Sequence, residues 1–175
     1  VFDEPAFRTF PHAGVALQNG RLIVRLHEQA RQREHEALHD PLTGLPNRAM
    51  FSDRLGTRLA SRAEQHHDAT VGIALMDLDG FKAINDGHGH PVGDAALVHF
   101  AATLRRHLRP ANTIARLGGD EFALILMNCS GDDACLLLER LQQALAGSPL
   151  SVPGAALSLR FSAAVAELPA PESLE

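Results

Sequence analysis

The chain has 175 residues, of which 45% are hydrophobic and 21% are charged, as in an ordinary globular protein. Its length suits one domain with a short extension. A net charge of −5 and a pI near 6.0 argue against a protein that coats nucleic acid. No apolar run approaches a membrane span and no signal peptide is present, so we expect no membrane contact from this fragment.

The two cysteines, Cys129 and Cys135, are expected to be reduced thiols, which fits a cytoplasmic protein. Residues 1–39 form an N-terminal extension in which a helix is predicted from about residue 13 to residue 39. The apolar stripe of this helix thins after Ala30, so a signalling coiled coil and a solvated linker helix are both open. Asp40 precedes a proline and is predicted to end the helix.

The remaining sequence predicts seven elements in the order βααββαβ, after a helix over 48–63 that Asn47 caps. Since the strands over 113–117 and 122–127 form a hairpin, we expect an α+β domain whose central, mainly antiparallel sheet is flanked by helices. The other predicted elements are a strand over 71–77, a helix directly after it, helices over 94–108 and 132–146, and a strand over 156–167.

The tip of the predicted hairpin reads Gly118-Gly119-Asp120-Glu121-Phe122. The two glycines leave room for a bulky ligand to approach the backbone. Carboxylates on a rigid turn beside an open backbone suit a divalent metal that holds phosphates. The alternative is a solvated turn that needs no chemistry.

A second group of polar residues follows the strand over 71–77, which ends in Asp77. A strand that ends in a carboxylate and turns into a helix is a common phosphate-site geometry, because the new helix offers free N–H groups. Asp77 can supply a metal ligand, and Lys82 can supply a cation for a triphosphate. The alternative is a plain turn, with Asp79 as the helix cap and Lys82 as a solvated charge.

Together these segments resemble the GGDEF domain of bacterial diguanylate cyclases. The resemblance covers about residues 38–168, and four separated blocks in the right order are a specific signal. The blocks are Asp40-Pro41-Leu42-Thr43-Gly44-Leu45-Pro46-Asn47-Arg48, Asp77-Leu78-Asp79-Gly80-Phe81-Lys82 with Asn85-Asp86, Gly89-His90 with Gly93-Asp94, and Arg116-Leu117-Gly118-Gly119-Asp120-Glu121-Phe122.

The resemblance implies a cyclase or palm-like GGDEF domain over residues 40–175. That domain is truncated at its C-terminal end, because the family continues with a last helix that carries basic residues toward the phosphates. Residues 10–26 of the extension resemble the closing helix of a GAF sensor domain. The parent protein is expected to join GAF and GGDEF domains, or a GGDEF domain and an EAL phosphodiesterase domain.

The implied reaction condenses two GTP molecules into cyclic di-GMP and two pyrophosphates. It is expected to occur in a homodimer and to depend on Mg²⁺, or on Mn²⁺ in its place. The resemblance assigns the metal to Asp77, the carbonyl of Leu78, Asp120 and Glu121. The implied catalytic residues are Asp120, which activates the 3′-hydroxyl, together with Glu121 and Lys82.

For substrate binding, the resemblance places Phe81 and Lys82 at the phosphates, and the open backbone of Gly118 and Gly119 beside them. Two further residues, Asn85 and Asp94, are expected to read the base. A carboxylate at Asp94 can accept from both N–H groups of the guanine edge, and adenine would leave it unpaired.

Two further expectations concern regulation. Active cyclases of the family often carry Arg-x-x-Asp before the hairpin as a product-binding inhibitory site, and here it reads Arg109-Pro110-Ala111-Asn112. This site is therefore degenerate, and we predict weak or absent product inhibition.

The alternative function is a catalytically silent module that binds GTP and controls a neighbouring EAL phosphodiesterase domain. Asp40 and Arg48 are expected to pair with each other in a structural role.

Overall fold

The computed structural model of this chain describes residues 24–29, 32–33, 35–65 and 70–168. Contacts divide the chain into two units, with the boundary between Ala37 and Leu38. In the first unit the described residues 24–29, 32–33 and 35–37 are helical, and residues 1–23 of the predicted extension lie outside the described part. The helical stretch ends at Leu38, as the Asp-Pro sequence predicted.

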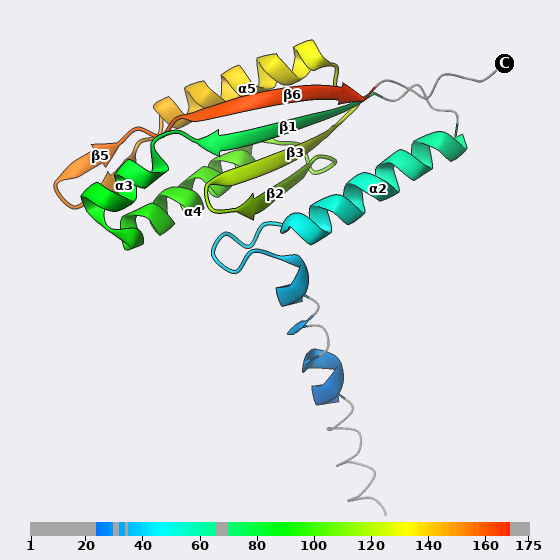
Figure 1. The fold of residues 1–175 in the computed structure, drawn as a ribbon, viewed down its shortest axis with the longest axis horizontal. Helices are drawn as coiled ribbons and strands as arrows, with labels where there is room; N and C mark the ends of the chain where they lie inside the picture. The colour runs from blue at the N-terminus through cyan, green and yellow to red at the C-terminus, as the bar shows by residue number, and fades with distance from the viewer. Residues whose placement is uncertain (1–23, 30–31, 34, 66–69, 169–175) are drawn as a thin grey trace, which may run out of the picture. The chain divides into compact units, whose positions relative to one another are not determined.

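The second unit is built on a four-stranded sheet (Figure 1). Its strands follow the spatial order β2 (Thr113–Gly118), β3 (Glu121–Met127), β1 (Val71–Leu78) and β6 (Phe161–Leu168). All three neighbouring pairs are antiparallel. The α+β class and the antiparallel sheet expected from the sequence are therefore confirmed.

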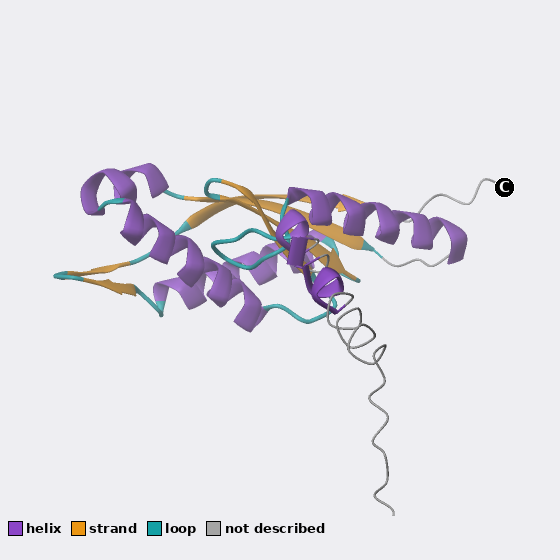
Figure 2. Ribbon diagram, turned by 90° about the horizontal axis from the view of Figure 1, so that it is seen from below, coloured by secondary structure: helices purple, strands orange, loops and turns teal. Residues whose placement is uncertain are grey.

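Helices cover both faces of the sheet (Figure 2). Alternate side chains of β3 point to opposite faces, and the buried ones divide accordingly. Phe122, Leu124 and Leu126 pack in one core with α4 (His90–His107) and α5 (Gly131–Ala146), while Ala123 and Ile125 pack in a second core with α2 (Arg48–Gln65). No described helix is both long and apolar enough to cross a membrane.

The two helices predicted after β1 are both present, but the second begins earlier than expected. The first, α3, runs from Phe81 to His88, and α4 begins at His90 instead of the predicted Asp94. Pro91 in the first turn of α4 explains the difference, because proline is tolerated where the helix N–H groups have no partner. Gly89 separates the two helices at φ 84°, a conformation that favours glycine.

The predicted strand over 156–167 is wrong in one respect, because the structure divides it. Its first part belongs to β5 (Ala155–Leu157), which pairs with β4 (Leu150–Val152) in a separate two-stranded sheet. Its second part is β6 of the main sheet. Leu159 lies between them in the chain and is buried in the core. The alternating pattern therefore reports which side chains are buried and continues where the chain passes from one sheet to the other.

Candidate metal and nucleotide site

The hairpin between β2 and β3 turns at Gly119 and Asp120, as predicted. Gly118 and Gly119 have φ values of 147° and 52°, which other residues rarely adopt. A Cβ atom added at either glycine would meet nothing within 4 Å. The turn therefore carries Asp120 on a backbone that is open to a ligand.

The end of β1 lies against this turn. Asp77 is the register partner of Glu121, and the N–H of Leu78 donates to the carbonyl of Asp120 at 3.3 Å. The antiparallel pairing thus brings the four predicted metal-binding residues to one end of the sheet. Asp77 and Glu121 also line an open cavity of about 510 Å³ on the side of the sheet that faces α2, together with Arg48, Leu75, Leu117 and Ser162.

Negative charge is concentrated at this end of the sheet. The pKa of Asp77 is raised above 3.8, first by partial burial and then by the charges of Asp120, Glu121 and Asp79. A cation between these oxygens would offset their repulsion, and hard oxygen ligands are those that Mg²⁺ and Mn²⁺ accept. The donor set therefore fits the predicted divalent metal.

The described residues contain no group of three His, Cys, Asp or Glu side chains that could hold a metal by themselves. A site here thus relies on the carboxylates of Asp77 and Asp120 and on the backbone oxygen of Leu78. Glu121 is engaged differently, because its carboxylate lies 3.3 Å from a guanidinium nitrogen of Arg48. Both side chains are more than half exposed, at 57% and 65%.

The helix that follows β1 begins without a side-chain cap. Gly80 occupies the N-cap position of α3 at φ 71° and ψ 18°. Asp79 does not cap this helix, contrary to the simpler interpretation of the sequence, because its Oδ1 accepts from the hydroxyl of Ser162 at 2.7 Å. The first-turn N–H groups around Phe81 and Lys82, where the phosphates are predicted, have no side-chain acceptor.

The two predicted base-reading residues lie on the adjoining helices α3 and α4. A Cβ atom added at the buried Gly93 would overlap the side-chain oxygen of Asn85, so the Asn85 carboxamide lies directly over this glycine. Asp94 is the next residue and is exposed. The close helix contact thus brings Asn85 to the start of α4, where Asp94 also stands.

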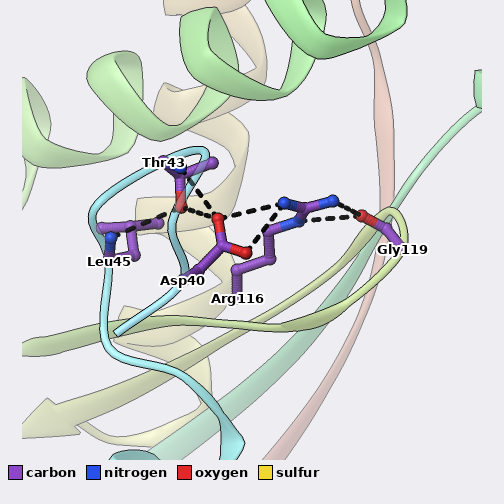
Figure 3. A network of polar contacts seen from close by, with 5 residues as sticks. All are labelled: Asp40, Thr43, Leu45, Arg116 and Gly119. Atoms are coloured by element: carbon purple, nitrogen blue, oxygen red, sulfur yellow. Dashed lines mark hydrogen bonds and ion pairs between the residues drawn. The ribbon is translucent and has the colours of Figure 1, made fainter. Parts of the chain in front are cut away.

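A largely buried arginine connects the hairpin to the segment before α2 (Figure 3). The Arg116 Nη1 donates to both carboxylate oxygens of Asp40 at 3.0 Å, and its Nε and Nη2 donate to the carbonyl of Gly119 at 2.9 and 2.7 Å. The expected pairing of Asp40 with Arg48 is wrong. Arg116 stands 76 positions away in sequence, and only the folded sheet brings it to Asp40.

The same carboxylate also organises the turn in which it lies. Asp40 Oδ1 accepts from the N–H and the hydroxyl of Thr43 at 2.8 and 2.6 Å. Burial alone would raise the pKa of Asp40, but the hydrogen bonds from Thr43 and Arg116 outweigh it and hold the pKa below 3.8. At 17% and 12% exposure, Asp40 and Arg116 form a largely buried ion pair.

The residues of the degenerate inhibitory site lie elsewhere. Asn112 precedes β2 and its side-chain oxygen accepts from the N–H of Met127 at 3.1 Å. Met127 is the last residue of β3, at the opposite end of that strand from Glu121. Arg109 and Asn112 line a cavity of about 490 Å³ at this end, so they take no part in the site around Asp77.

Comparisons with known proteins agree with this geometry. The sequence model of the family described as diguanylate cyclase, GGDEF domain, matches residues 37–173. The chain is 43% identical over 139 residues to the diguanylate cyclase DgcP of Pseudomonas aeruginosa, which spans 79% of this chain and 20% of that protein. It is 46% identical over 105 residues to MucR of the same organism, a bifunctional diguanylate cyclase/cyclic di-GMP phosphodiesterase, spanning 60% of this chain and 15% of MucR.

The fold agrees with a solved structure as well. The coiled coil and GGDEF domain of DgcB from Caulobacter crescentus, solved in complex with c-di-GMP, matches with a TM-score of 0.79 and 28% identity. The match covers 90% of this chain and 83% of that one. In contrast, the chain spans only about a fifth of the length of the first curated relative. The chain belongs to the GGDEF family of diguanylate cyclase domains.

Proposed function

We propose that this domain condenses two GTP molecules into cyclic di-GMP and two pyrophosphates, in a homodimer that requires Mg²⁺ or Mn²⁺. The observation that carries the proposal is the meeting of Asp77, Leu78 and Asp120 at one end of the sheet, beside an open glycine backbone. Relatives that are named diguanylate cyclases support the same reaction.

Each residue at this end has a chemical task in the proposal. Asp77, Asp120 and the carbonyl of Leu78 hold the metal, and Glu121 becomes a further ligand only by releasing Arg48. When bound, the metal neutralises phosphate charge and orients the leaving pyrophosphate. The carboxylate of Asp120 accepts the proton of the attacking 3′-hydroxyl.

The substrate is held by the two helices that follow β1. The N–H of Phe81 and the ammonium of Lys82 bind the phosphates. Asn85 and Asp94 form hydrogen bonds with the edge of the guanine base. One chain holds one GTP, so the 3′-hydroxyl of each nucleotide must reach the α-phosphate of the other. Two chains facing each other supply this arrangement, which makes a homodimer the working unit.

The direct test is an assay of this chain with GTP and Mg²⁺ that quantifies cyclic di-GMP and pyrophosphate. We expect product from the wild type and its loss by at least a hundredfold in Asp120→Ala, because both the metal and the proton acceptor are affected. Asp53→Asn, an exposed change in α2, serves as a control and should retain activity. An active Asp120→Ala variant would contradict the proposed role of the hairpin.

The relationship to MucR, which joins cyclase and phosphodiesterase activities, favours one second candidate. The domain would then bind GTP without turnover and control an adjoining phosphodiesterase. Wild-type protein that binds GTP but forms no product at any concentration would favour this candidate.

Product inhibition is a separate expectation of the proposal. We expect it to be weak or absent, because Asn112 stands where an acid would accept from guanine and its oxygen already accepts from Met127. Strong inhibition by low micromolar cyclic di-GMP would contradict this expectation.

A further inference from the structure

Ser162 holds the segment that connects the metal-binding strand to α3. It stands on β6 as the register partner of Asp77 and lines the same open cavity. Its hydroxyl donates to Asp79 Oδ1 at 2.7 Å, and the N–H of Asp79 donates to the carbonyl of Arg160 at 2.9 Å. Asp79 is therefore fixed to the β6 side through both its side chain and its backbone.

This contact determines what the Asp79 carboxylate can reach. Asp79 stands one position before Gly80, the N-cap residue of α3, and so lies next to the position from which an aspartate most readily accepts from first-turn N–H groups. Those groups have no side-chain acceptor in α3. A free carboxylate at Asp79 would compete with an anion for them and would repel it, since helix N-termini attract negative groups of any kind.

We propose that Ser162 is a positioning residue that keeps the Asp79 carboxylate on β6, so that the first turn of α3 stays available to the phosphates of the nucleotide. The inference rests on the proposed nucleotide site and deepens it. Ser162 acts only through Asp79.

The first test measures GTP affinity by calorimetry in the presence of Mg²⁺. Ser162→Ala should weaken GTP binding by about three- to tenfold, the usual effect of one lost hydrogen bond. In the cyclase assay it should raise KM more than it lowers kcat, because the chemical groups stay in place. Ser162→Thr keeps the hydroxyl on a strand position and should restore both values.

A control and a second variant separate positioning from general damage. Ser61→Ala removes a hydroxyl that bonds only to Thr57 within α2, and it should leave GTP affinity unchanged. Adding Asp79→Ala to Ser162→Ala removes both the competing acceptor and its charge, and it should recover most of the lost affinity. An unchanged affinity in Ser162→Ala, a weak Ser162→Thr variant, or no recovery in the double variant would overturn the inference.

Hydrogen exchange in nucleotide-free protein tests the inference without relying on the proposed function. The amides of Phe81, Lys82 and Ala83 should exchange more slowly in Ser162→Ala than in the wild type, because the released carboxylate accepts from them. Equal exchange rates would overturn the inference. If the wild type bound no GTP but the amides were still slower in Ser162→Ala, the proposed function would be refuted and the control of Asp79 by Ser162 would stand.

Discussion

The pKa of Asp77 depends on carboxylates of the hairpin and of the turn after β1. Burial and the carboxylates of Asp120, Glu121 and Asp79 raise its pKa, so it accepts a proton at a higher pH than an isolated aspartate. A protonated carboxyl cannot bind a cation, and metal affinity should therefore fall as the pH decreases toward this raised pKa. We therefore expect the acidic limit of the proposed activity to depend on all four groups.

Glu121→Gln removes one of these negative charges and should lower the pKa of Asp77. The loss of metal affinity would then begin at a lower pH than in the wild type. Carboxyl NMR titration of metal-free protein measures this pKa directly. Asp132→Asn, at the far end of the sheet in the first turn of α5, is the matched control and should leave the pKa unchanged. An unaltered Asp77 pKa in Glu121→Gln would contradict the electrostatic account.

The contact between Asn85 and Gly93 offers a second test at the scale of one residue. Gly93→Ala places a methyl group where the Asn85 oxygen lies, so the carboxamide must move away from the start of α4. We expect a several-fold higher KM for GTP in a chain that still folds, because alanine is favourable in a helix. Gly87→Ala in α3 meets nothing within 4 Å and should have a wild-type KM. Equal KM values in the two variants would refute a role for Asn85 at the base.

At the scale of elements, Arg116 couples the hairpin turn to the segment before α2. Its guanidinium spans from the Asp40 carboxylate to the Gly119 carbonyl, next to Asp120. One guanidinium can make both contacts because its donors are planar and point in fixed directions. The hairpin turn that carries Asp120 is thus tied to Asp40, near the start of the second unit in the sequence.

Arg116→Lys should break this coupling, since one ammonium cannot reach both acceptors. We expect a loss of about 1–3 kcal/mol in the free energy of unfolding and lower cyclase activity. Arg105→Lys is the matched control, because Arg105 makes a single bond of 2.7 Å to the Gly44 carbonyl that lysine can replace. Urea unfolding and product formation measure both effects. Equal behaviour of the two variants would contradict the coupling.

The elements also show what sequence reasoning could and could not predict. The hairpin and the strand that ends in Asp77 are contiguous patterns, and each was predicted to within one or two residues. The pairing of Asp40 with Arg116 joins positions that come together only when the turn before α2 packs against β2, so a local argument favoured Arg48 instead. Packing likewise creates the contact between Asn85 and Gly93 and the hydrogen bond between Asp79 and Ser162. No pattern in the neighbouring sequence predicts either of them.

The strand predicted over 156–167 shows the limit of hydrophobic alternation. Leu157, Leu159 and Phe161 alternate as in one strand, yet Leu159 belongs to neither sheet and is buried in the core where the chain passes from β5 to β6. Alternation reports which side chains are buried, and a chain that changes sheets can keep the same pattern. β4 was missed because three residues are too short to show any period.

For the whole molecule, the proposal of one GTP per chain has a kinetic consequence. Product formation per chain should rise with protein concentration, because two chains must meet before a phosphodiester bond can form. Initial rates over a dilution series measure this dependence. A constant rate per chain across the series would contradict assembly during the assay.

The central claim is that the end of β1 and the hairpin form one metal-dependent nucleotide site. It is tested most directly by calorimetric titration of GTP into the wild type and Asp77→Asn, each with and without Mg²⁺. We predict that Mg²⁺ strengthens GTP binding at least tenfold in the wild type and has little effect in Asp77→Asn, because Asp77 is a proposed metal ligand. Equal responses of the two proteins to Mg²⁺ would contradict the claim.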